Sequence, residues 1–236
     1  MAPPDLHSFP DGFRALIIGA SGAIGAALVQ QLRATPRCGA VTGLSRKSEP
    51  SLDFDDESSV QAAANVFARE QPFHLIVNAT GILHTPDFMP EKRLDQITYA
   101  QLNTTFRINT FGPALVLAKF APLLDRQRGV MAVLSAKVGS IEDNRLGGWA
   151  SYRASKAALN MILKTAAIEV RRSNPQAVLL ALHPGTVDSA LSGPFRGATI
   201  GRPANDVALD LLQVLDNARS EDTGSFRSYQ GEKLPW

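Results

Sequence analysis

The sequence of 236 residues has a single cysteine, Cys38, and four isolated histidines. One thiol forms neither an internal disulfide nor a cysteine-rich metal site, and His7, His74, His84 and His183 lack the spacing of metal ligands. We therefore expect no bound metal and a reducing compartment, the cytoplasm. Aromatic residues make up 7% and the net charge is +2, with lysine and arginine scattered along the chain. This pattern argues against a nucleic-acid partner.

Long apolar runs are also missing. The best one, Ala114–Leu124, is too short to span a bilayer and contains Lys119, and residues 1–10 lack the apolar stretch of a signal peptide. We expect neither a membrane span nor a signal peptide. Hydrophobic residues at 44% and charged residues at 19% indicate a folded protein with a large core. No stretch resembles a linker, so we expect a single domain over residues 1–236, with residues 1–12 as an N-terminal extension.

Short apolar runs alternate with longer helical patterns along the chain. The runs are Ala15–Ile18, Ala40–Leu44, Leu75–Val77, Val130–Leu134 and Val178–Leu182, with a weaker one at Phe226–Tyr229. The helical patterns cover Ala23–Ala34, Ser58–Glu70, Tyr99–Asp125, Ser151–Ser173 and Pro203–Asn217. Continuous apolar runs suit strands buried on both faces, and the alternation predicts an α/β fold with a doubly wound parallel sheet. Ligands of such sheets bind beyond the carboxyl ends of the strands.

A glycine-rich loop, Gly19-Ala-Ser-Gly22-Ala-Ile-Gly25, directly follows the first expected strand and opens the first expected helix. This is the context that a dinucleotide fingerprint requires, because glycines permit a tight turn and the helix N-terminus presents N–H groups to a pyrophosphate. The alternative is a turn of small residues that merely packs the helix on the strand. The strand before the loop and the amphipathic helix after it favour dinucleotide binding.

The second expected strand ends at Ser45-Arg46, where many NAD-binding proteins have an acidic residue. A guanidinium can pair with a 2′-phosphate, which a carboxylate would repel. We therefore expect NADP(H) in preference to NAD(H), with Ser21, Ser45 and Arg46 as phosphate contacts. NAD(H) remains possible, since Arg46 is alternatively an ordinary surface arginine.

Tyr152 and Lys156 lie four residues apart in a helical pattern, so their side chains share one helix face. A fixed positive charge favours the ionised form of a nearby phenol, which makes the tyrosine usable as a proton donor or acceptor. The pair alone is weak evidence, because the same spacing arises by chance on exposed helices.

The glycine loop, the Tyr152–Lys156 pair and the element order together make the sequence from Arg14 to Trp236 resemble a short-chain dehydrogenase/reductase. That family has a single Rossmann domain of about seven strands. Residues 138–144, 147–149, 224–226 and 231–236 further resemble its C-factor-like branch. Asp53 lies where the family contacts adenine, after a third strand. Without the resemblance, the acidic segment from Asp53 to Glu57 would be a solvated turn in which Asp56 or Ser58 caps a helix.

Further segments resemble family motifs. Asn78-Ala79-Thr80-Gly81 resembles the signature that lies against the cofactor, and Asn109 lies where an asparagine kinks a helix and orders a proton-relay water. An amide that satisfies a helix break is the alternative for Asn109. The loop from Pro184 to Ser189 resembles the one that holds the nicotinamide. The resemblance thus implies a cofactor site made of Gly19, Ser21, Gly22, Ile24, Gly25, Ser45, Arg46, Asp53, Phe54, Asn78, Ala79, Gly81, Tyr152, Lys156, Pro184, Gly185, Val187 and Ser189.

The family's catalytic serine is not at its usual place. The resemblance puts that position at Ala136, with Ser135 one residue earlier and Ser140 four residues later. Successive residues of a strand point to opposite faces, so Ser135 replaces the usual serine only if the backbone turns there. We take Ser135 as the candidate, with Ser140 or no serine at all as the alternatives.

The resemblance implies an NADP(H)-dependent oxidoreductase that interconverts a carbonyl and a secondary alcohol, with Tyr152, Lys156, Asn109 and Ser135 as catalytic residues. The alternative is an NADP-binding signalling or scaffold protein with little reductase activity, motivated by Ala136 and the C-factor-like segments. We expect a small carbonyl or alcohol substrate, no membrane or nucleic-acid partner, and a homodimer or homotetramer. Residues 190–202 are expected to form a lid, in which Arg196 recognises an acid or simply faces solvent.

Overall fold

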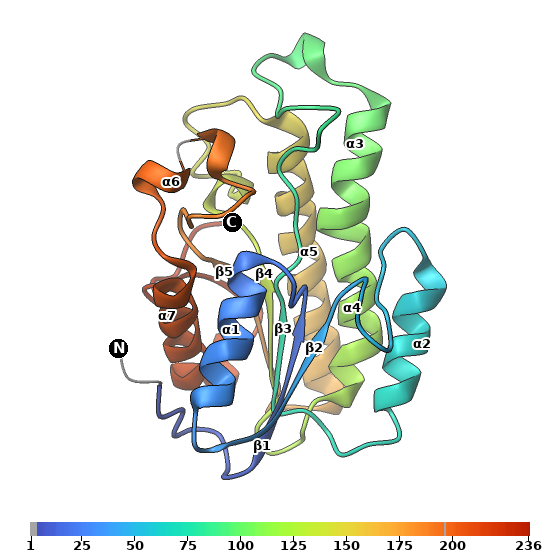
Figure 1. Ribbon diagram of the computed structural model, residues 1–236, viewed down its shortest axis with the longest axis vertical. Helices are drawn as coiled ribbons and strands as arrows, with labels where there is room; N and C mark the ends of the chain where they lie inside the picture. Colours follow the sequence, from blue (N-terminus) through green and yellow to red (C-terminus); the bar gives the residue numbers. More distant parts are fainter. Residues whose placement is uncertain (1–3, 196) are drawn as a thin grey trace.

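One sheet of six parallel strands organises the computed structural model, which describes residues 4–195 and 197–236 (Figure 1). The strands are β1 (Phe13–Ile18), β2 (Cys38–Leu44), β3 (Leu75–Asn78), β4 (Val130–Leu134), β5 (Val178–His183) and β6 (Ser225–Ser228). Their spatial order is β2-β1-β3-β4-β5-β6, and each neighbouring pair is parallel. The order reverses between β1 and β3, which is where a doubly wound sheet binds its ligands.

The described residues form one strand fewer than the roughly seven of the family pattern. The difference lies at the β2 edge, where the resemblance implied a further strand before Asp53. There Pro50 has no N–H to donate, and the N–H of Asp53 donates to Ser59 Oγ at 2.9 Å. Leu52 N–H does donate to the carbonyl of Ser45 at 3.0 Å, but one bond makes no ladder. This segment is therefore a loop along the edge of the sheet.

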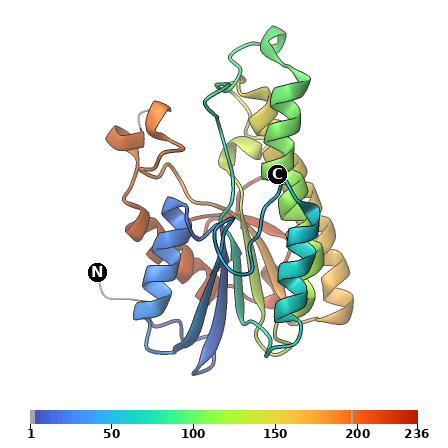
Figure 2. The same cartoon turned by 45° about the vertical axis from the view of Figure 1, so that its right-hand side comes forward.

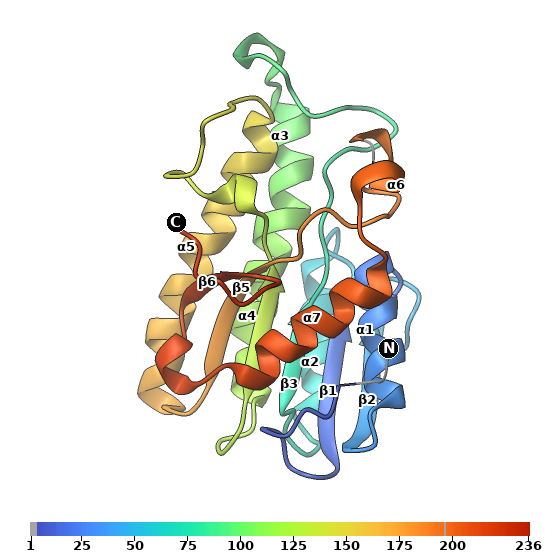
Figure 3. The same cartoon turned by 90° about the vertical axis from the view of Figure 1, so that its left-hand side faces the viewer.

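Helices cover both faces of the sheet, which confirms the predicted fold class. Helices α1 (Ala23–Ala34) and α7 (Ala204–Asn217) lie on one face, and α2 (Glu57–Phe67), α4 (Gly112–Phe120) and α5 (Ala150–Ser173) lie on the other (Figures 2 and 3). Helix α3 (Tyr99–Phe106) extends the line of α4 beyond the sheet, and α6 (Gly197–Ile200) lies among the loops there (Figure 1). No helix within residues 4–195 and 197–236 is long and apolar enough to cross a membrane.

Strand side chains alternate between two apolar cores. In β1, Ala15 and Ile17 pack towards α1 and α7, whereas Leu16 and Ile18 pack towards α2, α4 and α5. Each residue of β3 and β4 is buried, which accounts for their unbroken apolar runs. The expected N-terminal extension contributes to the first core, because Leu6 and Phe9 are each 1% exposed.

The single helix expected over residues 99–125 is divided in the structure. A π-helical turn, Arg107–Phe111, separates α3 from α4, and a short 3₁₀ turn, Ala121–Leu123, follows α4. The N–H of Gly112 donates to the carbonyl of Arg107, five residues earlier, as in a π helix. Pro113 has no N–H for the carbonyl of Asn109, so a regular α-helical bond is impossible there.

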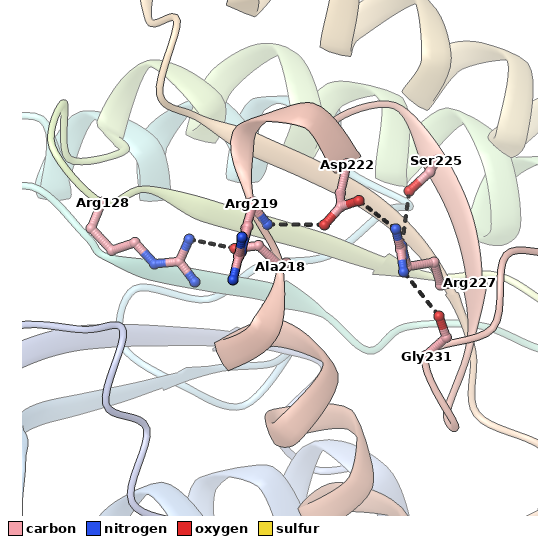
Figure 4. A network of polar contacts seen from close by, with 7 residues as sticks. All are labelled: Arg128, Ala218, Arg219, Asp222, Ser225, Arg227 and Gly231. Atoms are coloured by element: carbon pink, nitrogen blue, oxygen red, sulfur yellow. Dashed lines mark hydrogen bonds and ion pairs between the residues drawn. The ribbon is translucent and has the colours of Figure 1, made fainter.

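A polar network fastens the end of α7 to the neighbouring loops (Figure 4). Arg128, just before β4, donates to the carbonyl oxygens of Leu215, Asp216 and Ala218, and its guanidinium lies 4.8 Å from the ring centroid of Phe9. A cation at a helix C-terminus compensates the partial negative charge of the unpaired carbonyls. Nearby, Asp222 accepts from the guanidinium of Arg227, which also donates to Ser225 Oγ and Gly231 O.

Candidate active site

A cavity of about 330 Å³ opens beyond the carboxyl ends of the central strands. Its walls come from the start of α1, the loops after β3, β4 and β5, helix α5, and the segment from residue 187 to residue 200. Tyr152 and Lys156 both line it. The cavity therefore lies at the place where the fold binds ligands.

The predicted pair meets on the inner face of α5. Lys156 is 3% exposed, and its Nζ lies 6.0 Å from the ring centroid of Tyr152. Nζ also donates to the carbonyl of Leu134, the last residue of β4, at 2.8 Å. This bond fixes the ammonium between the end of the sheet and the tyrosine.

Burial dominates the titration of both side chains. It raises the pKa of Tyr152 to about 12 and lowers the pKa of Lys156 to about 8. Desolvation of the phenolate is the cause of the raised tyrosine pKa, and it acts against the lowering expected from the lysine. At neutral pH Tyr152 is thus a neutral phenol that carries a proton, and Lys156 is charged.

Asn109 lies in the π-helical turn and is fully buried. Its Oδ1 accepts from Ile82 N and its Nδ2 donates to Ile82 O, both at 2.8 Å, while Nδ2 also donates to Ser155 Oγ at 3.2 Å. A Cβ on Gly81 would lie 3.4 Å from both Asn109 Oδ1 and Lys156 Nζ. The asparagine therefore holds the loop after β3 against α5, close to the lysine ammonium.

Neither serine near β4 offers an unoccupied proton to the cavity. Ser135 is 3% exposed and its Oγ donates to Asn160 Oδ1 at 2.6 Å. Ser140 Oγ donates to the carbonyl of Trp236 at 3.1 Å, and Ser140 does not line the cavity. Ala136 does line it. For Ser135 to donate to a substrate carbonyl, its bond to Asn160 must break.

The glycine loop has the backbone geometry of a phosphate-binding turn. Gly19 has φ +83°, which side chains disfavour, and a Cβ on Gly25 would lie 2.1 Å from the carbonyl oxygen of Gly19. Gly22 caps α1 without a side-chain hydrogen bond, and Ser21 beside it is exposed. The first N–H groups of α1 therefore face outward with no side-chain acceptor at the cap, while Ile24 lines the cavity.

Three predicted contacts follow β2 in the sequence. Arg46 is exposed and forms no ion pair within residues 4–195 and 197–236, whereas the hydroxyl of neighbouring Ser45 accepts from Lys47 N at 3.1 Å. Asp53 is partly buried, and its carboxylate accepts from Asp55 N at 3.1 Å.

The acidic segment also caps a helix. Asp56 is the N-cap of α2 and accepts from Ser58 N at 2.9 Å, as the alternative interpretation of these acids expected. Phe54 lies against Gly112, where an added Cβ would be 2.2 Å from the phenylalanine ring. Gly112 is therefore required for Phe54 to pack beside α4.

The segments after β3 and β5 face one another across the cavity. Asn78 is 1% exposed; its Oδ1 accepts from Thr80, but its Nδ2 is buried without a partner among the described residues. Gly185, with φ +75°, packs on the ring of Tyr229. Ala79, Gly81, Pro184, Gly185, Val187 and Ser189 all line the cavity. The orphaned amide, the crowded glycines and the uncapped helix fit a bound dinucleotide.

Several residues that line the cavity or support its walls were missed by sequence reasoning. Trp149 precedes α5 in a left-handed conformation, with φ 56° and ψ 41°, and lines the cavity. Glu91, 3% exposed, accepts from Ser151 N at 3.2 Å and from Ser151 Oγ. His183 also lines the cavity, and burial lowers its pKa to about 4, so the ring is neutral. A buried acid and a left-handed tryptophan leave no signature in a sequence pattern.

Comparison with known proteins places this geometry among oxidoreductases. The family model described as "short chain dehydrogenase" matches residues 14–198. The C-signal of Myxococcus xanthus is 38% identical over 145 residues, which cover 61% of this chain and 83% of the relative. A 1-hydroxy-2-glutathionyl-2-methyl-3-butene dehydrogenase of Rhodococcus sp. (strain AD45) is 29% identical over 188 residues, 80% of each protein.

Solved structures have the same fold. Carbonyl reductase Sniffer of D. melanogaster is similar with a TM-score of 0.82 at 20% identity, covering 97% of this chain and 100% of that one, which shows the fold alone. The NADPH-bound carbonyl reductase from chicken fatty liver is similar with a TM-score of 0.80 at 25% identity, with the same coverage of 97% and 100%.

Proposed function

We propose that this chain, which belongs to the short chain dehydrogenase family, is an NADP(H)-dependent oxidoreductase that interconverts a carbonyl and a secondary alcohol. The family makes the chain an oxidoreductase. The finer assignment rests on one observation, the convergence of Tyr152 and Lys156 on a cavity bordered by the start of α1.

The cofactor would lie from the glycine loop to the loop after β5. Gly19 and Gly25 let the loop close on the start of α1, whose N-terminus would face the pyrophosphate. Arg46, exposed at the end of β2, is available for a 2′-phosphate, with Ser21 and Ser45 nearby, and this supports NADP(H) over NAD(H). The nicotinamide supplies or accepts the hydride when bound.

The protein would handle the proton. Tyr152 is neutral at pH 7 because its pKa is about 12, so its hydroxyl is ready to protonate the oxygen of a carbonyl that is being reduced. Lys156 remains charged below about pH 8 and stabilises negative charge that develops on the tyrosine oxygen. Asn109 positions the loop after β3 beside that ammonium. Ser135 would assist only after release from Asn160.

The test is the reduction of a panel of aldehydes and ketones, which is monitored as the loss of NADPH absorbance. Tyr152→Phe should lower kcat by about 10³-fold and leave the Kd for NADPH within about twofold, because only the proton donor is lost. Tyr99→Phe is the matched control, since Tyr99 is 86% exposed on α3. Turnover by Tyr152→Phe at the wild-type rate would contradict the proposed role.

A second candidate is an NADP-binding signalling or scaffold protein with little reductase activity. Ala136 in the cavity favours it, because the substrate carbonyl then lacks one hydroxyl donor. The likeness to C-signal is consistent with it. Tight binding of NADPH without turnover of any carbonyl would support this candidate and exclude the first.

We also propose a lid over the cavity, an oligomeric state and a cellular location for this protein. Residues 190–202 would act as a lid, with the 3₁₀ turn Gly193–Phe195 beside the cavity. Arg196, expected either to recognise an acid or to face solvent, lies outside the described residues. Exposed Phe111, Met161 and Ile168 around α4 and α5 support a homodimer or homotetramer. The lone thiol, Cys38, supports a cytoplasmic location.

A further inference from the structure

We propose that the cavity selects a neutral carbonyl compound that carries one flat apolar ring, held against Trp149 and Phe195. We call these two side chains the aromatic wall. The inference rests on the proposed function, because it names the substrate class of the same site.

The wall is built from two segments that are distant in the sequence. The ring centroid of Trp149 lies 5.1 Å from that of Phe195 and 6.3 Å from that of Tyr152, with interplanar angles of 62° and 74°. Such edge-to-face pairs keep ring faces available to a third ring, and they place the wall directly beside the proton donor. The ring centroid of His84 lies 5.9 Å from that of Phe195.

The rest of the substrate end is also apolar. Its other lining residues with apolar side chains are Leu83, Ala136, Val138, Leu191 and Ile200. Pockets for small organic ligands are commonly apolar with a few polar groups that set orientation. Here the orienting group is the hydroxyl of Tyr152.

Charged groups near the cavity are already engaged. Lys156 donates to Leu134 O, and Lys137 lies 3.6 Å from the carboxylate of Asp143. No arginine and no acidic residue lines the cavity within the described part of the chain. A substrate carboxylate or phosphate would therefore lose its hydration without gaining a dedicated partner. This arrangement selects a neutral substrate.

One side chain of the aromatic wall, Trp149, is held rigidly. Trp149 adopts the left-handed conformation that bulky residues avoid, and such a conformation persists only where surrounding contacts impose it. The backbone N–H of Trp149 donates to the backbone carbonyl of Glu91. The carboxylate of Glu91 in turn accepts from the backbone N–H and the hydroxyl of Ser151. The tryptophan is thus fixed before a substrate arrives, which reduces the entropy lost on binding.

The size of the cavity limits the substrate to about one ring. Its volume of about 330 Å³ lies at the low end for small-molecule sites and includes the end beside the glycine loop, where the nicotinamide would lie. A monocyclic aryl aldehyde or ketone fits the remaining space, whereas a polycyclic substrate does not.

The first experiment compares kcat/KM with NADPH for four ketones: acetophenone, butanone, methyl para-acetylbenzoate and para-acetylbenzoate. The last two share a ring and a ketone and differ in charge, so we expect the ester to exceed the acid by about tenfold. We expect acetophenone to exceed butanone by about tenfold as well, because of ring contact with the wall.

The second experiment removes the ring of Phe195 from the wall. Phe195→Leu keeps an apolar side chain and should lower the preference for acetophenone over butanone by about fivefold. Tyr99→Leu removes an aromatic ring from an exposed position and should leave that preference unchanged. Equal rates for acid and ester, or an unchanged preference in Phe195→Leu, would overturn this inference alone. Failure of wild-type protein that binds NADPH to reduce any of the four ketones, or any carbonyl of the wider panel, would overturn the proposed function together with it.

Discussion

The nucleotide side of the cavity and its substrate side are built by different means. On the nucleotide side, the shape comes from the backbone: Gly19 and Gly25 allow the loop to approach α1 closely, and the cap of that helix has no side chain. On the substrate side, the shape comes from side chains such as Trp149 and Phe195, which stand on loops. A backbone site tolerates few changes, whereas side chains on loops can vary without disturbing the sheet.

The loops of the substrate side are held by contacts from remote segments. Ser140 Oγ and Glu142 N both donate to the carbonyl of Trp236, at 3.1 and 3.0 Å. Glu91 fastens the start of α5 in a similar way. The substrate side therefore depends on long-range contacts, while the nucleotide side depends on a short continuous segment. This contrast can be tested from either side.

Gly25→Ala should have the largest effect, and on the nucleotide side alone. The new Cβ would lie 2.1 Å from the carbonyl oxygen of Gly19, so the loop must move away from α1. We expect the Kd for NADPH to rise about 100-fold, which corresponds to about 2.7 kcal/mol. Isothermal titration calorimetry measures it, with circular dichroism as a check of folding. Gly22→Ala, whose Cβ would lie 3.4 Å from the same oxygen, should have a much smaller effect.

Ala136→Ser should act on the substrate side alone. A hydroxyl at this lining position adds a donor for the substrate carbonyl, and we expect kcat/KM for aldehydes to rise about tenfold with NADPH affinity unchanged. Steady-state kinetics and a binding titration check both parts. A rise in activity with Ser135→Ala, or no change with Ala136→Ser, would show that the carbonyl lies elsewhere.

The charge of Lys156 links the two sides and should set the pH dependence. Because burial lowers its pKa to about 8, kcat/KM for reduction should fall about tenfold per pH unit above that value. Between about pH 8 and pH 10, Lys156 is protonated in the unfolded protein but has lost its proton in the folded protein. The free energy of unfolding should therefore rise with pH in this window. Urea denaturation at several pH values measures it. Lys156→Met should remove this pH dependence and stabilise the fold at pH 7 by about 1–3 kcal/mol.

Glu91→Ala should give the smallest effect, a loss of about 1–2 kcal/mol in the free energy of unfolding, because the start of α5 loses its acceptor. Thermal or urea denaturation measures the loss. Glu91→Gln, which retains an acceptor oxygen, should lose less than Glu91→Ala. Equal stability of Glu91→Ala and wild type would mean that α5 does not depend on this cap.

Local patterns predicted most of the sheet and the nucleotide side. The bounds of α1 agree with the expected Ala23–Ala34, because a strand, a glycine loop and an amphipathic helix follow one another directly. The apolar pattern missed the π-helical turn, since Pro113 is compatible with the first turn of a helix and the pattern continues through it, whereas the resemblance implied a helix kink at Asn109. The engagement of Ser135 by Asn160, and of Ser151 by Glu91, was also missed. Those contacts join residues far apart in the chain, and no short spacing encodes them.

The π-helical turn at Arg107–Phe111 has a consequence for how the chain tolerates changes of length. A π turn corresponds to one residue more than a regular α-helical turn, so it is equivalent to an insertion retained within one long helix. Deleting a single residue there would remove the extra residue and bring the segment closer to a regular α helix, so the wide turn that holds Asn109 would be lost. Asn109 would then face away from Ile82. Substitutions are tolerable along much of this helix, whereas a one-residue deletion within the turn would remove the contact between the helix and the loop beside the cavity.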